Sequence, residues 1–235
     1  MVTSRELISR LRSEGRTQLT EVEAKELLKQ SGIPVVDTRL AVSRDEAISI
    51  GADIGFPVVL KIVSPDIIHK SDAGGVMLNL ETPEQLANAY NKILDQIKRK
   101  YPEARIHGVS IQKMANPGLE VIMGMSKDPQ FGSVLMFGLG GILVEILKDI
   151  SFRIIPLTRK DAREMLREIK GSQLFKGYRG QAPVDTSKLE EMILNVSNFV
   201  EQYPEVKELD LNPVIISGDS AIAVDARVVL EEVTS

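Results

Sequence analysis

Apolar positions recur along this chain with two spacings, and the alternation between them predicts its elements. Leu7, Ile8 and Leu11 share one face of a helix over residues 4–14, which Gly15 ends. Further helices are predicted where Ser or Thr precedes Glu or Gln by three residues, because that spacing forms a capping box. Two more helices are predicted from the helical spacing of apolar residues alone. The predicted helices after the first span residues 20–31, 43–54, 82–100, 159–170 and 186–202.

Short β-branched and apolar runs, broken by Gly, Pro and Asn, predict strands between these helices. They span residues 35–42, 58–63, 75–80, 106–114, 119–126, 132–138, 143–147, 152–157, 206–217 and 221–230. Residues 171–182, rich in Gly, Lys and Arg, are expected to form a loop. Neighbouring strands followed by helices favour an α+β fold with mixed sheets over a regular βαβ winding.

Composition narrows the classes of function. The net charge of −4 gives no electrostatic case for nucleic-acid binding. The absence of cysteine excludes disulfides, thiolate metal ligands and a cysteine nucleophile. Charged residues throughout 1–16 argue against a secretory signal, and no apolar run approaches the roughly 20 residues that span a bilayer. We therefore expect a soluble, cytoplasmic protein with neither a nucleic acid nor a membrane as partner.

The segment 58–76 carries the most telling chemistry. Lys61 interrupts an apolar strand, where it is either a solvated position with a snorkelling stem or a fixed cation for phosphate oxygens. His69 follows in a loop broken by Pro65 and ended by Gly74 and Gly75. A lone histidine is usually a surface or satisfied core residue, but neutral imidazole is also a competent nucleophile for phosphoryl transfer.

The end of the chain predicts a hairpin with a possible metal site. If Gly218-Asp219 is a two-residue turn, Asn212 opposes Asp225 and Asp210 opposes Arg227. All four then share one face, and opposed Cβ atoms lie about 5 Å apart, so one hard cation could bridge the oxygens. The alternative is an ordinary polar face with an Asp–Arg cross-strand pair, and a one-residue slip in register would separate the ligands.

Glycines are closely spaced in the run Gly138-Leu139-Gly140-Gly141. Such a run is either a tight turn or a place where backbone N–H groups approach an anion. It matches neither the Walker A motif nor the dinucleotide fingerprint.

Taken together, these segments resemble the ATP-grasp family, and within it the β subunits of NDP-forming acyl-CoA synthetases, which are relatives of succinyl-CoA synthetase. The likeness covers residues 20–230. It is carried by residues 23–28 with 32–34, 56–61, 68–76, 128–132, 137–141 and 209–213. The run 68–76 together with 138–141 is specific to the acyl-CoA branch, whereas the lysine strand and the Asn-Pro hairpin are shared more widely.

The resemblance implies two α+β lobes that grip a nucleotide between them. We expect a helical extension over residues 1–19, an N-terminal lobe over 20–105 and a C-terminal lobe over 106–235. The nucleotide is ADP or ATP with Mg²⁺, and GDP or GTP use is left open. The site residues that the resemblance implies are Lys61 at the phosphates, Gln112 and Met114 beside the base, Glu120 facing the cleft, Asn212, Asp225 and Asp210 at the metal, and His69 as phosphate carrier.

The chain has no CoA-binding domain and no domain with the family's first phosphohistidine. The resemblance therefore implies a separate α subunit that supplies both, in an expected α₂β₂ assembly. Two other functions stay open. One is an ATP-grasp ligase that works without phosphohistidine, and the other is a non-catalytic nucleotide-binding subunit that regulates a partner. The acyl group and the direction of the reaction are not determined by this sequence.

Overall fold

The computed structural model describes residues 3–67, 70–141, 149–177 and 182–232. The chain forms two compact units. Unit 1 comprises Met1–Leu19, Glu23–Val35 and Asn116–Ser235, and unit 2 comprises Thr20–Val22 and Val36–Ala115. The expected divisions after residues 19 and 105 fall elsewhere in this structure. The first helices share a hydrophobic core with the C-terminal strands, and residues 108–113 pair inside the other sheet.

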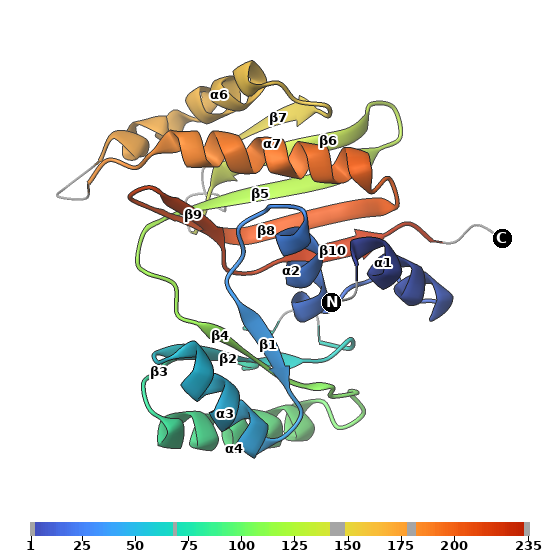
Figure 1. Cartoon of the computed structure of the whole chain (residues 1–235), viewed down its shortest axis with the longest axis vertical. Coiled ribbons are helices and arrows are strands. Elements are labelled where there is room, and N and C mark those ends of the chain that lie inside the picture. Colours follow the sequence, from blue (N-terminus) through green and yellow to red (C-terminus); the bar gives the residue numbers. More distant parts are fainter. Residues whose placement is uncertain (1–2, 68–69, 142–148, 178–181, 233–235) are drawn as a thin grey trace. The chain divides into compact units, whose positions relative to one another are not determined.

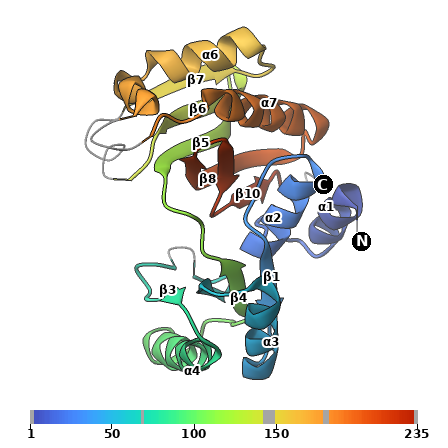
Figure 2. The ribbon, with the colours of Figure 1, turned by 60° about the vertical axis from the view of Figure 1, so that its left-hand side comes forward.

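Unit 2 is an antiparallel sheet with strand order β1-β4-β2-β3, covered on one face by two helices (Figures 1 and 2). Its elements are β1 (Thr38–Ala41), α3 (Arg44–Ile54), β2 (Val58–Val63), β3 (Val76–Leu80), α4 (Pro83–Lys100) and β4 (Gly108–Lys113). Its core includes Ile62, Ile93, Ile97 and Ile111, all almost fully buried. Every predicted element of this unit is therefore confirmed, with bounds moved by a few residues.

Unit 1 contains a six-stranded sheet in the order β10-β8-β5-β6-β7, with β9 paired to β8. Its strands are β5 (Leu119–Asp128), β6 (Gly132–Leu139), β7 (Ile150–Ile154), β8 (Val206–Ser217), β9 (Ser220–Ala223) and β10 (Arg227–Leu230). Its helices are α1 (Ser4–Ser13), α2 (Glu21–Gln30), α6 (Arg159–Glu168), the 3₁₀ helix η1 (Lys170–Lys176) and α7 (Thr186–Gln202). Only the first two residues of α2 fall in unit 2. Phe137 and Phe199 are among the largest fully buried side chains of the core that the helices share with the sheet.

The starts of α3 and α4 follow the predicted capping signals with one shift. Ser43 Oγ accepts the Glu46 N–H at 3.2 Å, while the Glu46 carboxylate accepts the N–H of Val42, one residue before the cap, at 2.8 Å. The same arrangement opens α4 at Thr82. The polar side chains therefore satisfy backbone donors that each first turn leaves unpaired.

The structure differs from the sequence prediction at two places. The predicted strand 221–230 is split into β9 and β10, with residues 224–226 between them. The expected loop 171–182 begins with the 3₁₀ helix η1. The predicted strand 143–147 lies outside the described residues. Among the described residues, no helix combines the length and apolarity needed to cross a membrane.

Candidate functional site

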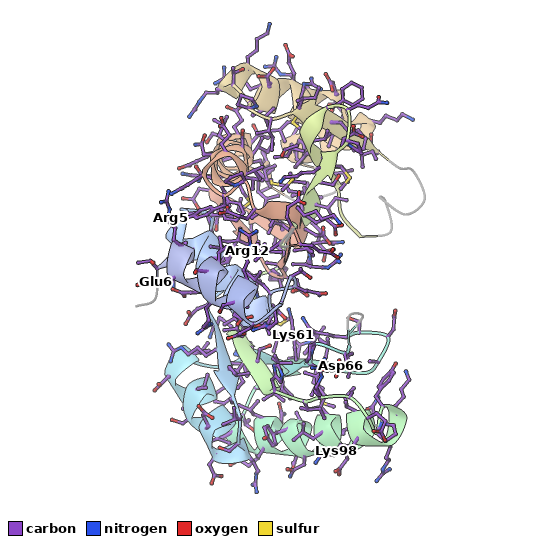
Figure 3. All side chains as sticks on the ribbon, turned by 90° about the vertical axis from the view of Figure 1, so that its right-hand side faces the viewer. Arg5, Glu6, Arg12, Lys61, Asp66 and Lys98 are labelled. Carbon is purple, nitrogen blue, oxygen red and sulfur yellow. The ribbon has the colours of Figure 1, made fainter. Side chains whose placement is uncertain are left out.

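Lys61 lies in the middle of β2, a strand whose residues are all buried (Figure 3). Its Nζ donates to Glu21 Oε1 at 2.6 Å, and the exposed fractions of the two side chains are 6% and 1%. A charged side chain is rarely buried unless it is paired, so the ion pair accounts for this position. The interpretation of Lys61 as a solvated or snorkelling residue is therefore wrong.

Glu21 also holds a second lysine. Its other oxygen, Oε2, accepts a hydrogen bond from Lys70 Nζ at 2.8 Å, and the Lys70 side chain is 20% exposed. Each oxygen of the Glu21 carboxylate therefore binds one ammonium group. Sequence reasoning missed Glu21 as a partner of Lys61 and of Lys70. No local pattern marks an ion pair between residues 40 positions apart.

His69 lies outside the described residues, but the segments on either side of it are well anchored. Asp66 accepts three hydrogen bonds from Arg105, from the backbone N–H at 2.7 Å, from Nε at 3.1 Å and from Nη2 at 2.7 Å. These bonds to Arg105 lower the pKa of Asp66 to about 2. After the histidine, the Gly75 N–H donates to the Lys70 carbonyl at 2.7 Å. Hydrogen bonds therefore hold described residues of unit 2 both before and after the pair 68–69.

Strand β4 presents the residues that were expected beside the base. Gln112 is fully buried, and its Oε1 accepts a hydrogen bond from Thr38 Oγ1 at 3.4 Å. The Met114 N–H donates to the Pro57 carbonyl at 3.1 Å. Both residues belong to unit 2, as Lys61 does. The Met114 amide already has a partner there, so a base would use other backbone groups near this strand end.

Glu120 lies on β5 of unit 1, beside the glycine run. Its carbonyl accepts the Gly140 N–H at 2.8 Å, and its side chain is exposed. A Cβ on Gly140 would lie 3.0 Å from the Glu120 Cβ and carbonyl carbon, so only glycine allows this close approach. The glycine run therefore brings the end of β6 against the backbone of Glu120.

The C-terminal hairpin has the predicted register. Ser217 pairs with Ser220 around the Gly218-Asp219 turn, and Asp210 pairs with Arg227 farther along. Between these pairs, the Val224 N–H donates to the Pro213 carbonyl at 2.9 Å, next to Asn212 and Asp225 in the same register. The pairing of Asp210 with Arg227 is therefore confirmed, and the opposition of Asn212 and Asp225 stays a prediction. The ion pair of Arg227, however, is made with Glu208, at 3.5 Å.

The electrostatics of this hairpin suit a cation. Asp210 is exposed, but the protein nearby still raises the pKa of its carboxyl group. The charge of Arg227 opposes this shift, and the negative charge of Asp225 adds to it. A divalent ion would relieve this repulsion, and Asn212 adds a neutral oxygen of the kind that Mg²⁺ accepts. No group of three His, Cys, Asp or Glu side chains that could hold a metal occurs among the described residues. The candidate metal ligands of the hairpin are instead two carboxylates and one amide.

Comparison with known proteins identifies the family. A family model described as an ATP-grasp domain matches residues 10–230. The β subunit of acetate–CoA ligase [ADP-forming] I from Pyrococcus furiosus is 49% identical over 227 residues, and the match covers 97% of each chain. The acetate–CoA ligase [ADP-forming] I of Archaeoglobus fulgidus is 45% identical over 97% of this chain, but only 33% of that longer protein is covered.

Solved structures of acetyl-coenzyme A synthetase 1 from Ca. Korarchaeum cryptofilum show the same fold. The structure with coenzyme A and Ca-AMPCP has a TM-score of 0.95 and 44% identity, and the match covers 97% of this chain and all of that one. A second, with a TM-score of 0.87 and 41% identity over 97% and 100% of the two chains, holds Mg-AMPPCP with its phosphohistidine segment pointing towards the nucleotide binding site. The chain therefore belongs to the ATP-grasp family and, within it, to the β subunits of ADP-forming acetate–CoA ligases.

Proposed function

We propose that this chain is the nucleotide-binding β subunit of an ADP-forming acyl-CoA ligase. The enzyme would interconvert acyl-CoA, ADP and phosphate with the free acid, CoA and ATP. The observation that carries the proposal is the likeness, over 97% of both chains, to a separately encoded β subunit. A longer relative contains this region as a third of its length, which supports a partner α subunit with the remaining functions. An α₂β₂ assembly is the expected stoichiometry.

His69 is the proposed phosphate carrier. A β-phosphate oxygen of ADP attacks the phosphorus of phosphohistidine, a P–O bond forms, and the P–N bond breaks. The electron pair of that bond returns to the ring nitrogen, and the imidazole leaves in its neutral form because its other nitrogen keeps a proton. Such a transfer depends mainly on alignment and charge neutralisation rather than on further covalent chemistry. A movable carrier fits this requirement, because the phosphorus must lie nearly in line with its acceptor.

Other residues of the chain would bind the phosphates, the metal ion and the base. Lys61 would contact the phosphate oxygens from β2, and Glu21 keeps its ammonium group in place while unbound. Asn212, Asp225 and Asp210 would hold the magnesium ion, which neutralises phosphate charge as it develops in the transition state. Backbone groups around Gln112 and Met114 would bind the base, and Glu120 would contact the nucleotide from β5.

Labelling of the chain with γ-³²P-ATP tests the carrier. We expect a phosphoprotein that survives base and is lost in acid, since phosphohistidine has this stability. His69→Asn should abolish the label, whereas His107→Asn, which changes the only other histidine, should keep it. Label in the His69 variant would contradict the relay. An unlabelled wild-type chain that still supports acyl-CoA turnover would favour the ligase without phosphohistidine.

A magnesium titration tests the hairpin site. Asn212→Ala and Asp225→Ala should each raise the Mg²⁺ concentration needed for half-maximal labelling, because each removes an oxygen ligand. Asp219→Asn is the matched control, since this exposed carboxylate lies at the turn of the same hairpin. Equal Mg²⁺ requirements in all four proteins would refute the metal site. Nucleotide binding without any ATP–ADP exchange in the presence of the α subunit would instead favour the regulatory subunit.

A further inference from the structure

A charged cavity of about 900 Å³ lies in unit 1 between α1 and the C-terminal end of α7. Its lining residues have no part in the proposed nucleotide, metal and carrier sites. One wall is a single face of α1, because its lining residues recur there every three or four positions. The opposite wall is formed by residues 201–205. The charged residues of the cavity are Arg5 and Arg12, which Figure 3 labels, and Glu201 and Glu205.

Arg12 is the most informative of these residues. Its side chain is half-buried, and its Nε is shielded from solvent but meets no hydrogen-bond acceptor among the described residues. The neighbouring Arg10 and Arg16 both pair with Glu23, at 3.5 and 2.7 Å. An unsatisfied buried donor destabilises a fold, and nearly all such groups in native proteins have a partner. The Arg12 guanidinium therefore has donors available for a group from outside the chain.

The cavity keeps opposite charges apart. Arg5 and Arg12 are about 10 Å apart along the axis of α1, because they are seven positions apart in the same helix. Glu201 and Glu205 lie on the facing wall, at the carbonyl end of α7, which carries partial negative charge. None of these four side chains forms an ion pair within the part of the chain that the structure describes. An occupant would therefore place an anion against α1 and hydrogen-bond donors against the end of α7.

The size of the cavity favours a segment of polypeptide over a free ion. Its volume is in the range of cavities that hold drug-sized ligands, well above that of one carboxylate or phosphate. A polypeptide supplies backbone N–H donors together with charged side chains, as the two walls require. The planar guanidinium of Arg12 can bind a carboxylate through two parallel hydrogen bonds. An Asp or Glu side chain is therefore the group that matches this arginine.

We propose that the cavity binds a segment of the α subunit, with a carboxylate of that segment on Arg12. This inference rests on the proposed function, which gives the chain an α subunit as its partner. A phosphate relay between subunits requires them to meet in one orientation, and complementary charges across an interface supply this specificity. The ATP-grasp model matches only from residue 10, so the first part of α1, with Arg5, precedes the general domain.

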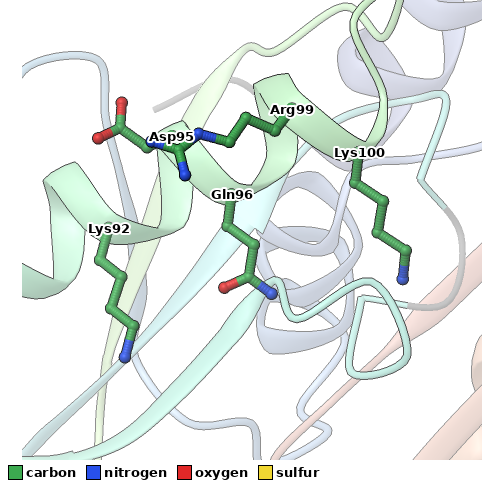
Figure 4. Close-up of a pocket in the computed structure, with 5 residues that line it drawn as sticks. All are labelled: Lys92, Asp95, Gln96, Arg99 and Lys100. Atoms are coloured by element: carbon green, nitrogen blue, oxygen red, sulfur yellow. The ribbon is translucent and has the colours of Figure 1, made fainter.

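A second charged hollow, on α4 of unit 2, lacks these features (Figure 4). All of its lining residues belong to that one helix, and among the described residues it contains no buried donor without a partner. Figure 4 shows Gln96 and Lys100 pointing to the same side of α4, and Lys100 Nζ donates to the Asp72 carbonyl at 2.9 Å. The exposed Lys92 of this hollow therefore serves as a control for general effects of positive charge.

The affinity of the chain for the purified α subunit tests the proposal. Arg12→Met should raise the Kd by about tenfold or more, because truncating one partner of a buried, hydrogen-bonded charge pair has effects of at least this size. Arg12→Lys should restore the affinity only in part, since an ammonium group lacks the planar fork. Arg10→Met and Lys92→Met each remove one positive charge outside the cavity and should bind as the wild type does.

Measurements on the chain alone separate docking from a structural role. Because Arg12 Nε has no partner among the described residues, Arg12→Met should melt at or above the wild-type temperature. Its Kd for Mg-ADP and its labelling by γ-³²P-ATP should equal those of the wild type. Should Arg12→Met fail to fold, Arg12→Lys carries the test, because it keeps the charge and most of the stem.

Wild-type affinity for the α subunit in Arg12→Met would overturn the proposal, as would an equal loss in Arg10→Met or Lys92→Met. A Tm well below the wild type in both Arg12 variants would show a structural role instead. Self-association of the chain, or a rise in Tm with inorganic phosphate, that Arg12→Met removes without changing the affinity for the α subunit would assign the cavity to a second copy or a small anion. A failure of the proposed function differs from all of these, because the wild-type chain would then neither bind the α subunit nor take label on His69.

Discussion

Gly140 offers a quantitative test of how the glycine run supports the site. A Cβ at this position would lie 3.0 Å from the Glu120 carbonyl carbon and Cβ and 3.1 Å from its carbonyl oxygen. Two of these atoms are backbone, so Gly140→Ala must push β5 and β6 apart rather than turn a side chain. Overpacking of this kind costs about 1–3 kcal/mol, and Ala regains about 0.4–1 kcal/mol by restricting the unfolded chain.

The expected net loss is about 1–2 kcal/mol. For a chain of this size, 1 kcal/mol corresponds to roughly 2–4 °C in Tm, so the melting temperature should fall by about 2–8 °C. The measurement is a thermal melt followed by circular dichroism without nucleotide. Because Glu120 must move, the Kd for Mg-ADP should also rise in the same variant.

Gly124→Ala is the matched control, since it makes the same change within β5. Its Cβ would meet Met136 Cε at 3.3 Å and the Leu209 carbonyl oxygen only at 3.6 Å. A methionine end group can move aside, so this variant should melt within a few degrees of the wild type or slightly above it. The reasoning is refuted if Gly140→Ala melts as high as the wild type, or if Gly124→Ala loses as much.

Three further predictions follow from the electrostatics. Asp210→Asn should have a higher Tm than the wild type at neutral pH without Mg²⁺, because a raised carboxyl pKa means that the charged form destabilises the fold. The variant should also lose the increase in Tm that Mg²⁺ gives the wild type. In the wild type, the pKa of Asp66 is lowered to about 2, so its charged form stabilises the fold above its ordinary pKa and this effect is lost as the pH falls towards 2. Arg105→Met removes the cause of the shift, so the fall in Tm below about pH 4 should be less steep in this variant. Lys113→Met should cost about 1–3 kcal/mol in urea unfolding, because its Nζ donates to the carbonyls of Gly55 and Phe56 at 2.6 and 2.9 Å. A Tm of Asp210→Asn at or below that of the wild type would contradict the first prediction. An unchanged dependence of Tm on acid pH in Arg105→Met, or an unchanged urea midpoint in Lys113→Met, would contradict the other two.

Local signals in the sequence determined most of the secondary structure and one part of the candidate site. The hairpin register followed from a two-residue turn and the period-2 alternation of strands, which is why the pairing of Asp210 with Arg227 could be predicted. The same signals could not predict the break of the last strand at residues 224–226, where Asp225 lies. The roles of Lys61, His69 and the metal ligands came from the family resemblance, because residue types alone left Lys61 with two readings.

Only the tertiary structure decided which charges meet. Glu21 lies 40 residues from Lys61 and 49 from Lys70, and it stands at a helix start where an acidic residue is unremarkable in sequence. The structure likewise placed residues 1–19 and 23–35 with the C-terminal sheet, although residues 36–115, which belong to the other unit, separate them from it in sequence. Helix periods and capping motifs depend on neighbours within a few residues. The partner of a buried charge and the sheet that a helix covers depend on which distant surfaces the folded chain brings together.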